Sequence, residues 1–128
     1  MEIDTEKDII LARRLARKIA EDLDFSIVNQ TRIATAVSEI TRNALTHGGG
    51  GFMKIRRLDK ENGLEITISD EGNGIPDVKR AMSDGYSTRN SLGMGLGGAK
   101  RLMDEFEIES KLGDGTTITM RKFLPRRS

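Results

Sequence analysis

Hydrophobic residues recur at helical spacing near the start of the chain. Leu11, Leu15, Ile19 and Leu23 lie four residues apart, a period that places all four on one face of a helix beginning near Asp8. The pattern predicts an amphipathic helix whose buried stripe consists of those four leucine and isoleucine side chains.

A second helix is predicted over the residues that follow. Its apolar positions, with the same spacing, are Ile33, Val37 and Ile40. Ser26 or Asn29 would cap its N-terminus, since both side chains can accept hydrogen bonds from free backbone N–H groups. The glycines at 48–51 would end it, because a glycine run loses too much conformational entropy in a helix.

Beyond these glycines the hydrophobic period changes to two, which predicts β-strands. The expected strands are 52–58, 64–69, 106–110 and 117–123, joined in pairs by turns at Asn62-Gly63 and Gly113-Asp114-Gly115. Between the hairpins we expect a short helix over 78–82, a glycine-rich loop to Gly98 and a helix to about Asp104. Early helices and short hairpin connections predict an α+β protein with one domain over 1–128. Its fold would be a two-layer α/β sandwich, a mixed, mostly antiparallel sheet with helices on one face.

Composition restricts the class of protein. Basic and acidic residues number 21 and 20, a net charge of +1, so the overall charge does not favour nucleic acid as a partner. The basic pairs 121–122 and 126–127 are expected to form a solvated terminus. The chain has no cysteine, which excludes disulfides and thiolate metal sites. No apolar run approaches the roughly 18 residues of a membrane-spanning helix, so we expect no membrane contact and a cytoplasmic location.

The predicted second helix contains a candidate metal or catalytic site. Glu39 and Asn43 are four residues apart and therefore lie on one face, one turn apart. A carboxylate beside a carboxamide suits Mg²⁺, which prefers oxygen ligands, and Glu39 can alternatively act as a general base on a hydroxyl. The alternative interpretation is an ordinary solvated helix face. His47, one turn further on, is expected at the helix end, near the negative end of the helix dipole.

Asp70 is a second candidate. Strand alternation places it on the same face as Leu64, Ile66 and Ile68, the face that the helices are expected to cover. A carboxylate there must receive hydrogen bonds, because burying an unpaired one is costly. The segment Glu71-Gly72-Asn73-Gly74-Ile75-Pro76 follows, and its glycines would let a ligand approach the backbone closely. Asp70 would suit the exocyclic amine of adenine, or it would form a plain Asx-turn at the strand end.

The glycine-rich segment 93–98 is a third candidate. Accessible N–H groups at a helix N-terminus bind anions, so this segment would form a mobile lid over phosphates. Gly93, Gly95 and Gly98 also match the dinucleotide pattern G-x-G-x-x-G, but no strand precedes them and no acidic residue lies about twenty positions later. A flexible loop without a ligand is the alternative, and 113–116 taken alone is typical of a hairpin turn.

The order of these motifs resembles the four sequence boxes of the GHKL ATPase superfamily, which has the ATP-binding Bergerat fold. The matching stretches are Glu39-x-x-x-Asn43, Asp70-x-Gly72-x-Gly74, Gly93-x-Gly95-x-Gly97 and Gly113-x-Gly115-Thr116. The resemblance covers nearly the whole chain and implies ATP and Mg²⁺ as cofactors. It implies that Asn43 holds the metal, Asp70 the adenine amine, and Thr116 the adenine end of the pocket. The residues that it assigns to nucleotide binding are Asn43, Asp70, Gly72, Gly74, Ile75, Gly93, Met94, Gly95, Leu96, Gly97 and Thr116.

Within that superfamily the chain resembles the stand-alone switch-protein kinases and anti-sigma factors, because it is too short for the added domains of the gyrase, Hsp90, MutL and sensor-kinase types. The stretches 34–43, 85–88 and 100–106 are most similar to RsbT-like serine/threonine kinases of the bacterial stressosome. Such a kinase would phosphorylate STAS-domain partners of the RsbS and RsbR kind, with Glu39 as the base, and then activate an RsbU-like phosphatase.

Two alternatives remain open at this stage. The stretch 44–48 is more similar to the anti-sigma factors of the SpoIIAB kind, which bind a sigma factor and phosphorylate an anti-anti-sigma factor. An ATP-binding module without catalysis is the other alternative. It is disfavoured by the joint presence of Glu39, Asn43 and Asp70, since a site freed from chemistry need not keep all three.

Overall fold

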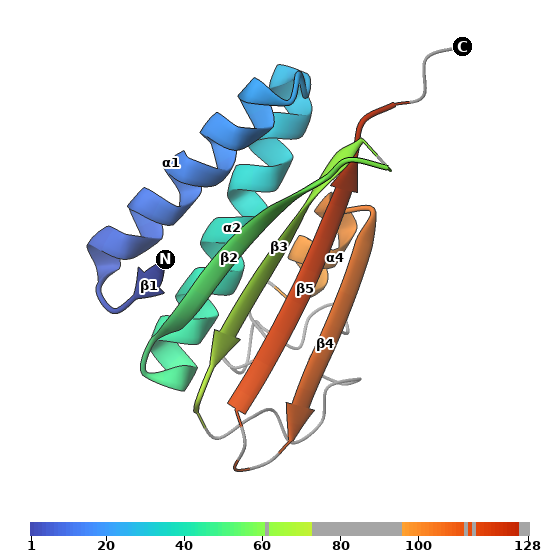
Figure 1. Ribbon diagram of the computed structural model, residues 1–128. Coiled ribbons are helices and arrows are strands. Elements are labelled where there is room, and N and C mark those ends of the chain that lie inside the picture. The colour runs from blue at the N-terminus through green and yellow to red at the C-terminus, as the bar shows by residue number, and fades with distance from the viewer. Residues whose placement is uncertain (61, 73–95, 112, 114, 126–128) are drawn as a thin grey trace.

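The structure, a computed structural model, describes residues 1–60, 62–72, 96–111, 113 and 115–125. Its elements are β1 (Glu2–Ile3), α1 (Glu6–Asp22), α2 (Ile27–Gly48), β2 (Gly51–Leu58), β3 (Gly63–Asp70), α4 (Leu96–Leu102), β4 (Glu105–Lys111) and β5 (Gly115–Phe123). Figure 1 shows two layers, with α1, α2 and α4 on one face of the sheet. The predicted two-layer sandwich is therefore confirmed, whereas the helix expected over 78–82 lies outside the described residues.

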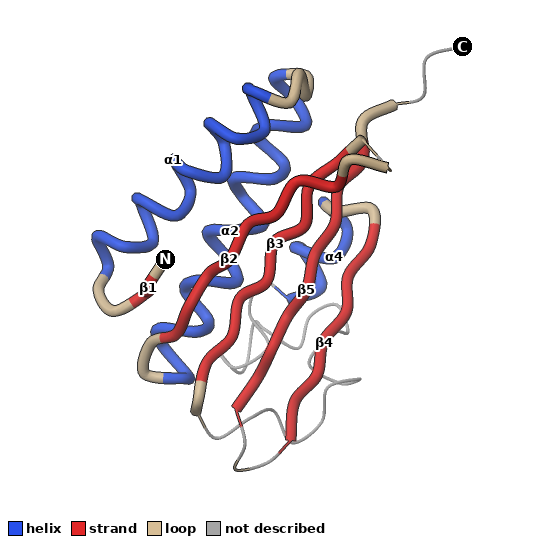
Figure 2. Tube along the Cα trace, viewed as in Figure 1, coloured by secondary structure: helices blue, strands red, loops and turns tan. Residues whose placement is uncertain are grey.

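The sheet has five strands in the order β1-β2-β3-β5-β4 (Figure 2). Every described pairing is antiparallel, and the two hairpins, β2–β3 and β4–β5, join through β3 and β5 at the centre. Asn62, in the first turn, has the positive φ of 51° that tight hairpins require. The sequence did not predict β1, because two residues are too few to display an alternating period.

The buried face of α1 differs from the predicted stripe. Leu11 and Leu15 are 50% and 42% exposed, so the prediction that they are buried is wrong, while Ile19 and Leu23 pack partly against the core. The buried residues of α1 are Ile9, Ala12, Ala16 and Ala20. Three of these four are alanines, whose small side chains let α1 lie close to α2, and a search for large apolar residues overlooks them.

The second helix begins and ends at the predicted signals. Ser26 is the N-cap of α2, and its Oγ accepts a hydrogen bond from the Asn29 N–H at 3.1 Å. The helix ends at Gly48, and Gly49 follows in the left-handed conformation with φ of 72°. This cap fixes the point at which the chain leaves the helix layer and enters β2.

Removal of the Ser26 hydroxyl should loosen the first turn of α2. We expect Ser26→Ala to lower the free energy of unfolding by about 1 kcal/mol, because an N–H group at the helix start loses its acceptor. Urea unfolding of this variant beside Ser26→Asp, which keeps an acceptor at the same place, measures the effect. Equal losses in both variants would contradict a capping role.

The basic residues at the end of β5 are structural, so the expected solvated terminus is wrong at 121–122. The Arg121 guanidinium donates to Glu65 at 2.8 Å and also contacts Glu105 and Glu107. Lys122 is buried, and its Nζ donates to the carbonyl of Leu102, the last residue of α4, at 2.8 Å. These contacts connect β5 to β3, to β4 and to the C-terminal end of α4.

Candidate functional site

Asp70 is the last residue of β3, and its side chain is half-buried toward the helix layer, as predicted. Its Oδ1 accepts a hydrogen bond from the Gly72 N–H at 2.9 Å, and the backbone of Thr116 also donates to the carboxylate. The bond to Gly72 is an Asx-turn, so Asp70 has both predicted properties: it closes a turn and presents an acceptor on the inner face.

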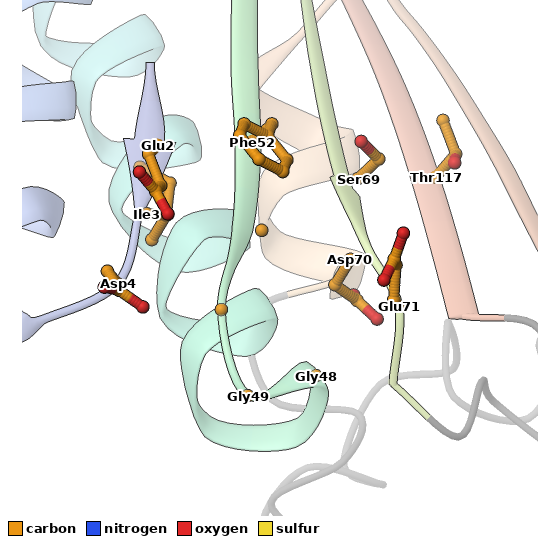
Figure 3. A pocket seen from close by; sticks show the side chains of 12 residues that line it. Glu2, Ile3, Asp4, Gly48, Gly49, Phe52, Ser69, Asp70, Glu71 and Thr117 are labelled. Atoms are coloured by element: carbon orange, nitrogen blue, oxygen red, sulfur yellow. The ribbon is translucent and has the colours of Figure 1, made fainter.

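Three glycines from separate segments of the chain pack against Asp70. Gly48 ends α2, Gly72 follows β3 and Gly115 begins β5. An added Cβ would clash with the Asp70 side chain at Gly48, with the Cα of Gly48 at Gly72, and with the Asp70 carbonyl oxygen at Gly115. Figure 3 shows Gly48 next to Asp70 at the end of α2. The sequence indicated Gly48 only as a helix terminator, although its structural role is to let α2 approach the end of β3.

Burial raises the pKa of Asp70 above its ordinary value of 3.8, against the lowering effects of the hydrogen bonds from Gly72 and Thr116 and of the nearby His47. His47 lies in the last turn of α2, as predicted. A carboxylate in a partly desolvated environment is stabilised when a ligand donates a further hydrogen bond to it. Such perturbed groups are concentrated at binding sites.

Thr116 lies directly opposite Asp70 in the ladder between β3 and β5. Thr116 is buried, and its Oγ1 lies 2.9 Å from the Oγ of Ser110 on β4. The residue predicted to support the adenine end of the pocket is therefore adjacent to the predicted adenine acceptor. Ser110, which holds the Thr116 hydroxyl, was not identified from the sequence, because its strand position alone shows no chemical signal.

Glu39 and Asn43 lie one turn apart on α2, and both side chains are half-buried, unlike the exposed Thr35, Arg42 and Thr46 on the same helix. The positions of Glu39 and Asn43 therefore do not form a fully solvated helix face. With a rise of about 1.5 Å per residue, Asn43 is about 7.5 Å along the helix from Gly48, which touches Asp70. The two predicted motifs thus belong to one region of the molecule.

The donors near Asn43 fit a Mg²⁺ ion that is held jointly with a nucleotide. The described residues include no group of three or more His, Cys, Asp or Glu side chains that could hold a metal by themselves. Mg²⁺ commonly takes one or two protein oxygens and completes its shell with substrate phosphates and water. The carboxamide oxygen of Asn43 and the carboxylate of Glu39 are ligands of that type.

The structure describes part of the predicted glycine-rich lid. Gly74, Ile75, Gly93, Met94 and Gly95 lie outside the described residues. Leu96 and Gly97, expected in the loop, form the first turn of α4, and the Leu96 side chain is fully buried. Since α4 packs against α2, the helix that follows the lid segment is fixed beside the helix of Glu39 and Asn43.

A hollow of about 450 Å³ opens where β1, the glycine run and the ends of β2, β3 and β5 meet (Figure 3). Its lining includes the carboxylates of Glu2, Asp4, Asp70 and Glu71. Because phosphates are repelled by carboxylates, this hollow is unsuited to a triphosphate. A nucleotide whose base contacts Asp70 would therefore direct its phosphates away from this hollow.

Comparisons with known proteins identify the family of the chain. Residues 4–122 match the family of histidine kinase-like ATPase domains. The serine/threonine-protein kinase RsbT of Bacillus subtilis (strain 168) is 48% identical over 122 residues, which cover 94% of this chain and 92% of that protein. An anti-sigma F factor of Caldanaerobacter subterraneus subsp. tengcongensis is 37% identical over 121 residues, which cover 90% of this chain and 85% of that protein.

Solved structures with the same fold include histidine kinase domains. The domain from the blue-light activated histidine kinase of Erythrobacter litoralis has a TM-score of 0.59 at 19% identity, and the match covers 91% of this chain but 60% of that one. The present chain thus spans about three-fifths of that neighbour. The catalytic domain of the histidine kinase ThkA has a TM-score of 0.58 at 16% identity, covering 96% of this chain and 95% of that one.

By its similarity to these proteins, the chain is an enzyme, a serine/threonine-protein kinase. Within the part of the chain that the structure describes, no helix is long and apolar enough to cross a membrane. From its motifs, its fold and the match over 4–122, the chain belongs to the family of histidine kinase-like ATPase domains, the GHKL group.

Proposed function

We propose that the protein transfers the γ-phosphoryl group of Mg-ATP to a serine or threonine hydroxyl of a STAS-domain partner. The observation that carries the proposal is the environment of Asp70. A half-buried carboxylate with a raised pKa lies on the inner face of the sheet, in a cradle of glycines at the end of α2. Such an acceptor suits the exocyclic amine of adenine.

Nucleotide binding would use the residues around this carboxylate. Asp70 accepts from the adenine amine, and Thr116 supports the same end of the base. Gly72, Gly74 and Ile75 follow Asp70 and let the base approach the backbone. The phosphates extend along α2, where the segment 93–97 covers them and Asn43 holds the metal. Mg²⁺, when bound, neutralises charge on the phosphate oxygens.

Glu39 is the proposed catalytic base. Its carboxylate lies one turn before Asn43 on the same face of α2, so a hydroxyl beside the γ-phosphate would lie within its reach. The serine or threonine oxygen forms a bond to the γ-phosphorus while the bond to the β-phosphate oxygen breaks. The hydroxyl proton passes to Glu39, and ADP departs. Phosphoryl transfer needs little beyond this positioning and charge neutralisation.

The proposed partners are those that the resemblance to RsbT-like kinases implies. As a partner-switching kinase similar to RsbT, the protein would phosphorylate STAS-domain proteins of the RsbS and RsbR kind and then activate an RsbU-like phosphatase. A second candidate is an anti-sigma factor that binds a sigma factor and phosphorylates an anti-anti-sigma factor. It is favoured by the 37% identity to an anti-sigma F factor and by the stretch 44–48.

Phosphotransfer to candidate partners tests the proposal. The protein is incubated with Mg-ATP and a candidate STAS-domain protein, and the partner's intact mass is followed over time. A gain of one phosphate that needs both the kinase and Mg²⁺ supports the STAS assignment. A different result would be that ATP binds tightly, that no STAS protein gains phosphate, and that a sigma factor is retained on the immobilised protein. In that case the anti-sigma-factor function replaces the STAS-kinase function.

A further inference from the structure

The outer edge of β2 is only partly paired. β1 covers its beginning through Ile3, and the backbones of Met1 and Met53 exchange two hydrogen bonds, both of 2.7 Å. Beyond Met53, no described residue pairs with this edge, although β2 continues to Leu58. Alternation along the strand turns the N–H and C=O groups of Ile55 and Arg57 to the side that Met53 uses for Met1. Two residues of β2 therefore present backbone donors and acceptors beside the sheet that no residue in the described part of the chain pairs with.

Basic side chains surround this edge. On β2 itself, Lys54, Arg56 and Arg57 are all exposed, and Arg56 forms an ion pair with Glu65 at 3.1 Å. The neighbouring α1 has its acidic residues in its first and last turns, whereas its middle, 9–20, carries four basic residues and no acidic one. The four are Arg13, Arg14, Arg17 and Lys18. Since the whole chain has a net charge of +1, this is a local excess of positive charge.

Exposed leucines complete the surface. Leu11 and Leu15 of α1 are 50% and 42% exposed. The ion pair between Glu6 and Arg42, at 3.6 Å, turns the Glu6 flank of α1 toward α2. Leu15 lies on the opposite flank, because nine residues at 100° each amount to two and a half turns. That flank is turned away from α2, and Figure 1 shows α1 on the β2 side of the helix layer.

We propose that this edge surface, 54–57 with Leu11 and Leu15, docks an acidic extended segment of a partner protein. The segment adds a strand beside β2, where its backbone pairs with Ile55 and Arg57. Alternate carboxylates meet Lys54 and Arg56 on the open face of the sheet. The intervening apolar side chains face the helix layer and cover the two leucines.

Charge and geometry favour this occupant over two others. A second copy pairing through its own β2 would place Lys54 and Arg56 against their equivalents, and like charges on adjacent strands are unfavourable. A nucleic acid would satisfy the positive charge but would leave the strand N–H groups and the leucines without partners. The surface lies on the β2 side of the sheet, away from β4 and α4, so docking is independent of the proposed nucleotide site.

Peptide binding provides the first test. A labelled peptide of alternating glutamate and valine, long enough to span β2, is titrated by fluorescence anisotropy beside a peptide of the same composition in two blocks. We expect the alternating peptide to bind at least about tenfold more tightly. Arg57→Pro, which removes an outward N–H at an exposed position, should lose this preference, whereas Arg57→Thr, which removes the charge and keeps the N–H, should retain it. Equal affinities for both peptides would overturn the proposal.

Amide hydrogen exchange locates the added strand. On saturation with the alternating peptide, the amides of Ile55 and Arg57 should become protected at least about tenfold, whereas those of Lys54 and Arg56, already directed toward β3, should not change. Failure of Ile55 and Arg57 to gain protection contradicts strand addition. Tighter binding of a DNA duplex than of the peptide, or self-association through β2 in sedimentation without peptide, would assign the surface to nucleic acid or to a second copy instead.

Discussion

Asp70→Asn is expected to weaken ATP binding by at least about 100-fold while leaving the fold intact. The carboxylate can accept from the adenine amine in addition to the N–H groups of Gly72 and Thr116, whereas a carboxamide turned to keep those bonds presents its own N–H groups to the base. The variant loses a charged acceptor, and the N–H groups of its carboxamide lie against those of the adenine amine. Together these two effects account for a loss of this size. Isothermal titration with Mg-ATP, beside Glu71→Gln as a neighbouring exposed control, measures it.

Because the pKa of Asp70 is raised, the Asp70→Asn variant also has an expected effect on the stability of the fold. The folded protein holds this proton more tightly than the unfolded chain, so the contribution of Asp70 to stability falls as pH rises from 3.8 through the raised pKa. Asp70→Asn should therefore not lower the free energy of unfolding at neutral pH. In the parent, ATP affinity should fall as the pH decreases toward that pKa, and in the variant it should stay flat. A variant that unfolds at neutral pH would show that Asp70 is structural.

Glu39→Gln is expected to reduce the rate of phosphotransfer by about 10²- to 10⁴-fold, the usual contribution of a general base, with little change in ATP affinity. Glutamine keeps the size and half-buried position of the side chain but cannot take the hydroxyl proton. Single-turnover transfer to the partner gives the rate, and titration gives the affinity. Glu21→Gln, an exposed carboxylate on α1, is the control. A parallel loss of affinity and rate would instead make Glu39 a binding residue.

Gly48→Ala and Gly49→Ala form a matched pair that distinguishes an effect on the binding site from an effect on the end of helix α2. A methyl group at Gly48 meets the Asp70 side chain, whereas at Gly49 it meets no atom but occupies a residue with φ of 72°. We expect Gly48→Ala to weaken ATP binding about tenfold or more, and Gly49→Ala to cost about 1 kcal/mol of stability with normal affinity. Titration and urea unfolding of both variants decide this, and the reverse pattern would contradict the glycine cradle.

Much of the fold was predictable because its signals are local. The strands 52–58 and 64–69, their turn at Asn62-Gly63 and the cap at Ser26 appear where the residue pattern places them. The error in α1 had a physical cause. Leu11 and Leu15 have the right spacing for a core stripe, but close packing of α1 on α2 selects the alanines, and tertiary contact decides between the two faces.

The site was predictable in its motifs but not in its packing. Asp70 could be placed on the inner face from strand alternation, and its need for hydrogen bonds was met by Gly72. The contact of Gly48 with Asp70 and the support of Thr116 by Ser110 join segments far apart in the sequence, so no local pattern predicts them. Lys122 was assigned to a solvated terminus for the same reason, since its partner at Leu102 belongs to α4.

A crystal structure of the protein with Mg²⁺ and a non-hydrolysable ATP analogue would show directly whether Asp70 binds the adenine base and Asn43 the metal. We expect the adenine amine within hydrogen-bond distance of the Asp70 carboxylate, the metal at the Asn43 carboxamide oxygen, and the γ-phosphate on the side of α2 that carries Glu39. A nucleotide bound elsewhere, or bound with its base remote from Asp70, would contradict this expectation.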